Sequence, residues 1–309
     1  MGGVPAHARH AASRAARDVT PFFSVVIPVF NRAGALKDAI ASVLAQTCPD
    51  FEIVVVDDGS SDNPKAALPA DPRIRFHAQA NHGASAARNA GIDLAQGRFV
   101  AFLDSDDRFL PHHLEAMKAV LENTENTAAY APVILERGQG RTMIKPPRGL
   151  REGEAMADYL LRDRGFVPTD TLAVPRELAA RMRYDESVRL GDDKDFAIRL
   201  ALSGCKFVFV EKPGAIYRDE ADPARLSGGG GNALWLERLR PRIPPRAYHG
   251  YRGWMIARNR NALSALPLYL SALFRGCYGP RMAAVVFLQV FLPARVYRAL
   301  SDGVLGSRE

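Results

Sequence analysis

The chain has 309 residues, of which 47% are hydrophobic and 24% charged, and its formal net charge is +7. This length supports one well-packed domain with an accessory region and excludes a single small module. Three widely spaced cysteines, Cys48, Cys205 and Cys277, exclude a cysteine-based metal cluster and are typical of a reduced, cytoplasmic protein.

The positive charge is concentrated near the C-terminus. Residues 232–300 contain eleven Arg, no Lys and one acid, Glu237, so this segment carries +10 and the rest of the chain −3. A basic segment of this kind indicates an anionic membrane surface or nucleic acid as a partner. Because the remainder of the chain is slightly acidic, we expect the chemistry to involve no nucleic acid.

The first half of the chain predicts a mostly parallel α/β sheet. Residues 1–20 are rich in Ala, Arg and His without a continuous apolar core, which indicates a disordered leader and not a secretory signal. Beyond it, short apolar runs alternate with helical patterns. The runs are FSVVIPV, FEIVVV, RIRFHA and RFVAFL, with helices from about Ala33 to Gln46 and from Ala84. Continuous apolar runs predict strands covered on both faces.

The order becomes looser after Asp107. We expect a helix after Pro111, a strand AAYAPVILE, an irregular basic stretch over 137–151, a helix around Phe196, and the strands KFVFV and AIYR. The run Gly228 to Gly231 predicts a flexible linker, followed by a separate Arg-rich region.

Polar residues follow three of the predicted strands. They are Asn31, the pair Asp57 and Asp58, and the acidic group Asp104, Asp106 and Asp107. Ligands of open α/β sheets bind beyond the carboxyl ends of the strands. The first loop, PVFNRAGA, lacks the paired glycines of a dinucleotide fold, which argues against a nicotinamide dehydrogenase.

The DSD segment is the candidate for binding a cation. In an extended segment, the carboxylates of Asp104 and Asp106 project to the same side, where a hard divalent cation can bind them together with substrate phosphates. The alternative is an ordinary turn or helix start before Pro111.

Three stretches together resemble the family 2 glycosyltransferases of the GT-A fold. They are SVVIPVFNR, SVLAQTCPDFEIVVVDDGSSD and NHGASAARNAGIDLAQGRFVAFLDSDD, and the likeness covers roughly residues 21–218. The resemblance implies a nucleotide site and a metal motif formed by Asp104 and Asp106, with Asp106 coordinating directly. The implied nucleotide-binding residues are Pro28, Val29, Phe30, Asn31, Asp58, Arg88, Asp104 and Ser105.

A later segment, GDDKDFAIRL, is similar to the family's acidic pair at the start of a helix. The resemblance implies that Asp193 is the catalytic base, with Asp192 and Asp195 as secondary candidates and Arg218 as an aid to the leaving group. A solvated helix N-terminus is the alternative for these acids. Two departures are Asp192 where Glu is usual and Lys194 where an aromatic residue often follows.

The resemblance thus implies an α/β protein with a GT-A, Rossmann-like, mostly parallel sheet flanked by helices. The Arg-rich and apolar composition of the C-terminal region adds a basic helical extension. The expected organisation is a leader over 1–20, a catalytic domain over 21–227, a linker over 228–231 and an amphipathic region over 232–309. Within the catalytic domain, about 21–107 binds the nucleotide-sugar and about 108–227 the acceptor.

The implied function is inverting transfer of a sugar from a nucleotide diphosphate donor, most simply a UDP-sugar, to an acceptor hydroxyl in polysaccharide or surface-glycan synthesis. The implied cofactor is Mg²⁺ or Mn²⁺, and the acceptor is a glycan or lipid-linked glycan. Two alternatives are a metal-dependent nucleotidyltransferase, which would release pyrophosphate, and a non-catalytic module that binds a sugar nucleotide or a membrane.

The basic region contains two apolar runs, NALSALPLYLSALF and RMAAVVFLQVFL, both shorter than the roughly 20 residues that span a bilayer. They predict helices that pack on the catalytic domain or in a homodimer, or helices that lie in an anionic membrane interface. The membrane alternative places the enzyme at the inner face of the cytoplasmic membrane. In this alternative, the Arg side chains contact the lipid headgroups. The aromatic residues that would lie in the membrane interface are Trp235, Tyr251, Trp254, Phe274 and Phe291.

Overall fold

A computed structural model describes residues 20–137, 140–218, 234–293 and 296. The predicted leader, apart from Thr20, and the predicted glycine linker lie outside these residues.

A seven-stranded sheet forms the centre of the molecule, in the order β10-β6-β9-β4-β1-β2-β3. All neighbouring strands in it pair in parallel except β9, which is antiparallel to β4 and β6. The strands are β1 (Phe23–Val29), β2 (Phe51–Asp57), β3 (Ile74–Ala78), β4 (Phe99–Phe102), β6 (Thr127–Tyr130), β9 (Ala173–Pro175) and β10 (Lys206–Phe209). The predicted mostly parallel sheet is confirmed.

A second, four-stranded sheet has the order β5-β11-β7-β8. Its strands are β5 (Arg108–Phe109), β7 (Val133–Glu136), β8 (Thr142–Lys145) and β11 (Ala215–Arg218). Two sequence predictions are corrected here. The run AAYAPVILE forms β6 and β7, which belong to different sheets, because Ala131 and Pro132 interrupt it. The stretch predicted to be irregular contains β8, which pairs with β7 as a hairpin.

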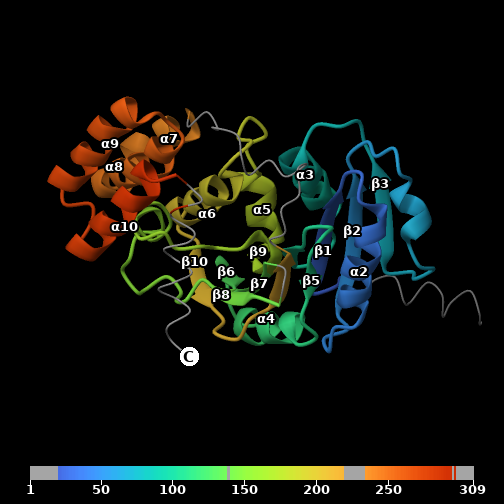
Figure 1. Cartoon of the computed structure of the whole chain (residues 1–309). Coiled ribbons are helices and arrows are strands. Elements are labelled where there is room, and N and C mark those ends of the chain that lie inside the picture. Colours follow the sequence, from blue (N-terminus) through green and yellow to red (C-terminus); the bar gives the residue numbers. More distant parts are fainter. Residues whose placement is uncertain (1–19, 138–139, 219–233, 294–295, 297–309) are drawn as a thin grey trace, which may run out of the picture.

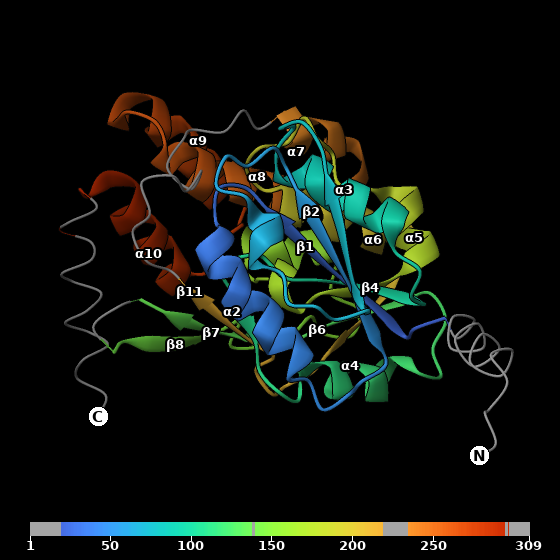
Figure 2. The ribbon, with the colours of Figure 1, turned by 90° about the vertical axis from the view of Figure 1, so that its right-hand side faces the viewer.

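Helices cover both faces of the large sheet (Figures 1 and 2). In Figure 2, α2 and α4 lie on one side of the sheet, and α3, α5 and α6 on the other. The helices are α2 (Ala33–Leu44), α3 (Ala84–Leu94), α4 (His113–Leu121), α5 (Arg176–Met182), α6 (Asp192–Leu202), α7 (Leu234–Leu239), α8 (Pro245–Tyr251), α9 (Ala262–Phe274) and α10 (Pro280–Phe291).

Alternation along the strands produces two hydrophobic cores. In β1, Val26 belongs to the core beneath α3 and α6, whereas Val25 and Ile27 belong to the core beneath α2 and α4. Successive side chains of a strand point to opposite faces, so a strand buried on both faces needs apolar residues at every position. This is why β1 and β2 read as continuous apolar runs.

The C-terminal helices join the core beneath α3 and α6. Trp235, Leu236 and Trp254 are buried together with Phe196 and Ile198 of α6, and the indole N–H of Trp254 donates to the carbonyl of Leu161 at 2.8 Å. Figure 1 shows α7 to α10 gathered at one end of the molecule, beyond α6. Of the described helices, none is both long and apolar enough to cross a membrane.

One glycine allows the turn before β4 to approach the start of β1 closely, at the end of the sheet opposite to the carboxyl ends of these strands. A Cβ added at Gly97 would lie 2.6 Å from the backbone of Phe23 and Ser24. The Gly97 N–H donates to Ser24 Oγ at 2.8 Å, and Ser24 Oγ donates to Glu52 at 2.6 Å, so the turn before β4 is fixed to β1 and β2.

We expect Gly97→Ala to lower the free energy of unfolding by about 1–3 kcal/mol, because the methyl group collides with backbone that cannot rotate away. Gly34→Ala is the matched control, because its Cβ meets nothing within 4 Å and it lies in α2; it should be neutral or stabilise by roughly 0.5–1 kcal/mol. Urea unfolding of both variants measures the difference. Equal free energies of unfolding for the two variants would contradict this role of Gly97 in the contact between β1 and the turn before β4.

Candidate active site

The predicted polar residues gather at the carboxyl ends of β1, β2 and β4. These three strands are parallel neighbours, so their ends meet at one edge of the sheet. The N-terminus of α6 reaches the same edge, because Arg88 of α3 contacts Asp104, which follows β4, and Asp192, which begins α6. The site is therefore built from segments that are about 100 residues apart in the chain.

Arg88 is the cation at the centre of this arrangement. Its guanidinium is buried and donates to Asp104 at 2.6 Å and to Asp192 at 3.1 Å, and it lies over the ring of Tyr184. Burial opposes the charge, but the two carboxylates more than compensate and raise the pKa of Arg88. Arg88 thus joins the turn after β4 to the N-terminus of α6.

The loops after β1 and β2 are held together by short polar contacts. Asn31 has a left-handed backbone and accepts from the Ser61 N–H at 2.8 Å. The buried Asp58 carboxylate accepts from the backbone N–H groups of His82 and Gly83, which lead into α3. Asp58 therefore fixes the loop that leads to Arg88.

The other predicted nucleotide-binding residues differ in exposure. Pro28 and Val29 are buried in β1, and Ser105 is buried in the turn after β4. Phe30 is 47% exposed and Asn31 is also exposed, at the rim of the same edge. Phe30 and Asn31 thus offer exposed side-chain surface to a ligand, whereas Pro28 and Val29 are buried in the strand that precedes them.

The DSD segment is a turn and not an extended strand, which corrects the geometry expected from sequence. The strand β4 ends at Phe102, and the Asp107 N–H donates to the Asp104 carbonyl at 3.1 Å. Asp104 and Asp106 consequently point to different partners, Arg88 and Arg32, the latter at 2.9 Å. Coordination of a metal by Asp106 stays a prediction.

The turn instead brings Asp107 next to Asp104 and to Asp170, which lies in the short helical turn η3 (Thr169–Thr171). Carboxylate oxygens of Asp104, Asp107 and Asp170 lie within 4.8 Å of one another. Asp107 and Asp170 are almost completely buried, and Asp107 Oδ2 has no hydrogen-bond partner. Burial and the neighbouring carboxylates raise the pKa of both groups.

These residues fit a divalent cation. Clustered carboxylate oxygens are the ligands that Mg²⁺ and Mn²⁺ prefer. Burial and, to a smaller extent, repulsion raise the two pKa values, and a bound cation would oppose both effects by stabilising the carboxylates. The backbone supports the cluster, since Asp170 Oδ1 accepts from the Asp104 N–H and Asp107 Oδ1 from the Arg218 N–H.

The acids at the start of α6 have separate environments. Asp192 binds Arg88 and the Ser85 hydroxyl. Asp193 is 22% exposed at its side chain and lies 3.3 Å from the Lys194 ammonium. Asp195 is buried and pairs with Arg199 at 2.7 Å. Asp195 therefore supports the helix, and Asp193 is the acid of this group without a bond to Arg88 or Arg199.

Arg218 is at the edge of the site. Its backbone N–H binds Asp107, but its guanidinium pairs with Asp38 of α2 at 2.9 Å. Contact with a leaving group would require this exposed pair to open, so the predicted role of Arg218 stays a prediction.

Sequence reasoning passed over Asp170 and gave Asp107 no role. Asp107 follows the DSD segment directly, so its place after a parallel strand was a usable signal. Asp170 lies in FVPTDTLAV, which has no repeat, spacing or charge cluster. Only the fold brings it within reach of Asp104.

This geometry agrees with comparisons to known proteins. Residues 24–182 match the family described as glycosyl transferase family 2. The chain therefore belongs to this family and is a glycosyltransferase. It is 29% identical over 255 residues to the amylovoran biosynthesis glycosyltransferase AmsB of Erwinia amylovora, covering 76% of this chain and 83% of that protein. It is 45% identical over 211 residues to an uncharacterized glycosyltransferase of Rickettsia felis, covering 67% of this chain but only 33% of that protein.

The fold is similar to that of S. aureus TarS. A crystal structure of TarS 1–349 in complex with UDP-GlcNAc matches with a TM-score of 0.57 and 16% identity, covering 92% of both chains. A complex of the same fragment with UDP matches with a TM-score of 0.52 and 16% identity, covering 88% of this chain and 76% of that chain. The central sheet with flanking helices is thus the GT-A fold predicted from sequence.

Proposed function

We propose that this glycosyltransferase transfers a sugar from a UDP-sugar to an acceptor hydroxyl with inversion at the anomeric carbon, in the synthesis of an exopolysaccharide or surface glycan. The observation that carries the proposal is the Arg88 bridge, because it holds the acidic turn after β4 and the N-terminus of α6 on one site. The similar TarS structures are complexes with UDP and UDP-GlcNAc, which supports a UDP-sugar as donor. The similarity to AmsB, an amylovoran biosynthesis glycosyltransferase, supports a role in exopolysaccharide synthesis.

In this mechanism, Asp193 is the general base. Its partly exposed carboxylate accepts the proton of the acceptor hydroxyl while the oxygen attacks the face of the sugar opposite to UDP. The bond from the anomeric carbon to the diphosphate breaks in the same step, so a single displacement inverts the configuration.

The leaving diphosphate needs compensation of its negative charge. Asp104, Asp107 and Asp170 would hold a divalent cation, Mg²⁺ or Mn²⁺, which stabilises the diphosphate as a Lewis acid when bound. Asp106 and Arg32 lie beside this cluster, and the ion pair with Arg88 orients Asp104. Phe30 and Asn31 contact the nucleoside at the rim.

We expect Asp193→Asn to reduce turnover by roughly two or more orders of magnitude, because an amide keeps the shape of the side chain but cannot accept the proton. UDP affinity in the presence of Mn²⁺ should be unchanged. Release of UDP from sugar nucleotides measures turnover, and calorimetry measures affinity. Turnover near wild type would place the base elsewhere.

The same assay tests the alternatives. Release of pyrophosphate would identify a nucleotidyltransferase, and the absence of any released product would indicate a binding module.

We propose further that the C-terminal helices contact the anionic inner face of the cytoplasmic membrane, near a lipid-linked acceptor. The support lies in α9 and α10, where Leu263 is 89% exposed and Phe274 83% exposed. On α9, exposed or half-exposed apolar residues recur at positions 263, 266, 270 and 274, which form one stripe of a helix.

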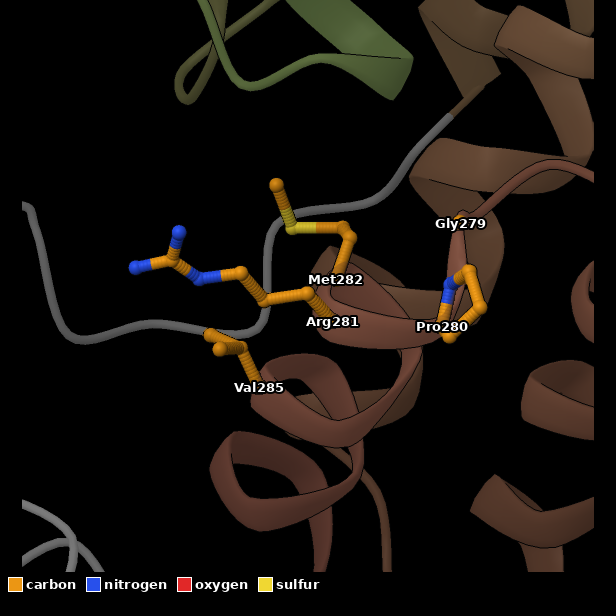
Figure 3. A pocket seen from close by; sticks show the side chains of 5 residues that line it. All are labelled: Gly279, Pro280, Arg281, Met282 and Val285. Atoms are coloured by element: carbon orange, nitrogen blue, oxygen red, sulfur yellow. The ribbon is translucent and has the colours of Figure 1, made fainter.

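The surroundings of this stripe suit anionic headgroups. Arg258, Arg260 and Arg275 flank α9, and Glu237 is the single acid of residues 232–300. At the start of α10, Gly279, Pro280, Arg281, Met282 and Val285 line a hollow of about 350 Å³, with the Arg281 side chain projecting outward (Figure 3). Trp235, Tyr251 and Trp254 do not take part as expected from sequence, because they are buried in the core that α6 shares.

We expect purified protein to float with anionic vesicles and not with neutral ones, and added salt to reduce this flotation. The double variant Leu263→Glu with Phe274→Glu should lose flotation, because both side chains are exposed and the charges oppose insertion. Ile144→Glu on β8 is the control, since Ile144 is also exposed, at 53%, but lies in the small sheet.

Equal flotation of the double variant and the wild type would contradict the membrane proposal. If neither floats and the wild type is a dimer that the double variant disrupts, the stripe is a homodimer interface instead.

A further inference from the structure

Lys194 has an unusual place for a lysine. Its side chain is 19% exposed, and its ammonium lies 3.3 and 3.4 Å from the two oxygens of Asp193. Burial lowers the pKa of Lys194, but the charge of Asp193 and the neighbouring Tyr251 more than compensate, so the net shift is upward. A charge this poorly solvated is retained only where an opposite charge faces it.

One C-terminal helix, α8, lies beside this pair, and α7 packs against α8. Burial raises the pKa of the Tyr251 phenol in α8. The charge of Lys194 lowers this pKa and the charge of Asp193 raises it, so Tyr251 lies close enough to interact with both groups. The Trp235 ring of α7 stacks edge-on with Tyr251 at a centroid distance of 5.5 Å. Both rings are at most 6% exposed.

Trp235 also packs closely against Gly191, the residue that caps α6. Gly191 has φ of +85° and caps the helix, and a Cβ there would lie 3.0 Å from the Trp235 ring. Arg238 of α7 pairs with Asp185 at 2.6 Å in the loop that leads to α6. Helix α7 therefore contacts both the cap of α6 and the loop before it. Both helices lie beyond residue 182, where the matched family region ends.

We propose that Lys194, together with Trp235 and Tyr251 of the C-terminal helices, forms a positioning element that fixes the carboxylate of Asp193 toward the acceptor. This inference rests on the proposed role of Asp193 as base. It gives α7 and α8 a function in the chemistry that is separate from membrane contact by α9.

The physical reason lies in the freedom of the carboxylate. Asp192 and Asp195 are fixed by Arg88 and Arg199, whereas the ionic partner of Asp193 is Lys194. Without the ammonium, the Asp193 side chain can turn toward water. A displacement of about 1 Å in a reacting group can reduce the rate about a hundredfold.

The test compares kcat and KM for UDP release from UDP-glucose, UDP-galactose, UDP-GlcNAc and UDP-GalNAc with Mn²⁺. We expect Lys194→Met to lower kcat about tenfold to a hundredfold and to leave the donor KM unchanged, because the lysine acts on the base and not on the donor. Lys206→Met on the exposed edge of β10 is the matched control and should resemble the wild type.

A double variant separates positioning from general support of the fold. Because Lys194 acts through Asp193, adding Lys194→Met to Asp193→Asn should reduce kcat no further. Losses that multiply in the double variant, or a Lys194→Met kcat equal to that of Lys206→Met, would overturn the inference. Lys194→Gln, which keeps a hydrogen-bond donor without the charge, replaces Lys194→Met if circular dichroism shows that Lys194→Met does not fold.

Failure of the underlying function is distinguishable. If the wild type releases no UDP, or if Asp193→Asn alone keeps its turnover, the assignment of Asp193 as base fails and the positioning inference fails with it. If Asp193→Asn is inactive while Lys194→Met is fully active, only the positioning inference fails.

Discussion

The structure depends on how it accommodates a concentration of negative charge at one edge of its central sheet. The carboxylates that meet there belong to Asp104, Asp106, Asp107, Asp170, Asp192 and Asp193. Carboxylates brought together in a partly buried site repel one another unless cations are interleaved. Arg88 serves Asp104 and Asp192, Arg32 serves Asp106, and Lys194 serves Asp193. Within the described residues, Asp107 and Asp170 have no ion pair, and their pKa values are raised.

This distribution explains why the site needs every layer of the molecule. Parallel strands deliver Asp104 and Asp107, helix α3 delivers Arg88, and a short turn before β9 delivers Asp170. Helices α7 and α8 then place Trp235 beside Gly191 and Tyr251 beside Lys194. A sugar-nucleotide diphosphate and a divalent cation would complete the same pattern of alternating charge, with the cation placed where the protein supplies none of its own.

The parts of the fold that sequence predicts are those fixed by local rules. Continuous apolar runs identified β1, β2 and β4 because strands buried on both faces need apolar residues at every position. The GT-A fold was implied by the resemblance of three stretches to the family 2 glycosyltransferases. The pairing of Asp104 with Asp106 was the less secure step, since it assumed an extended backbone where the chain turns at Ser105. Asp170 and the Trp235–Tyr251 contact depend on residues distant in sequence, so no local pattern reveals them. The sequence analysis placed the aromatic residues of the basic region in a membrane interface. Amphipathic composition shows that a ring is shielded from water, but not whether lipid or another part of the protein shields it.

The location of the cation is the most direct test of this account. Crystals of the protein with Mn²⁺ and UDP, measured near the manganese absorption edge, give an anomalous difference peak at the metal. We predict that this peak lies among the carboxylates of Asp104, Asp107 and Asp170, with the Arg88 bridge intact. A peak held by Asp106 in place of Arg32, with Asp107 and Asp170 remote from the metal, would contradict it.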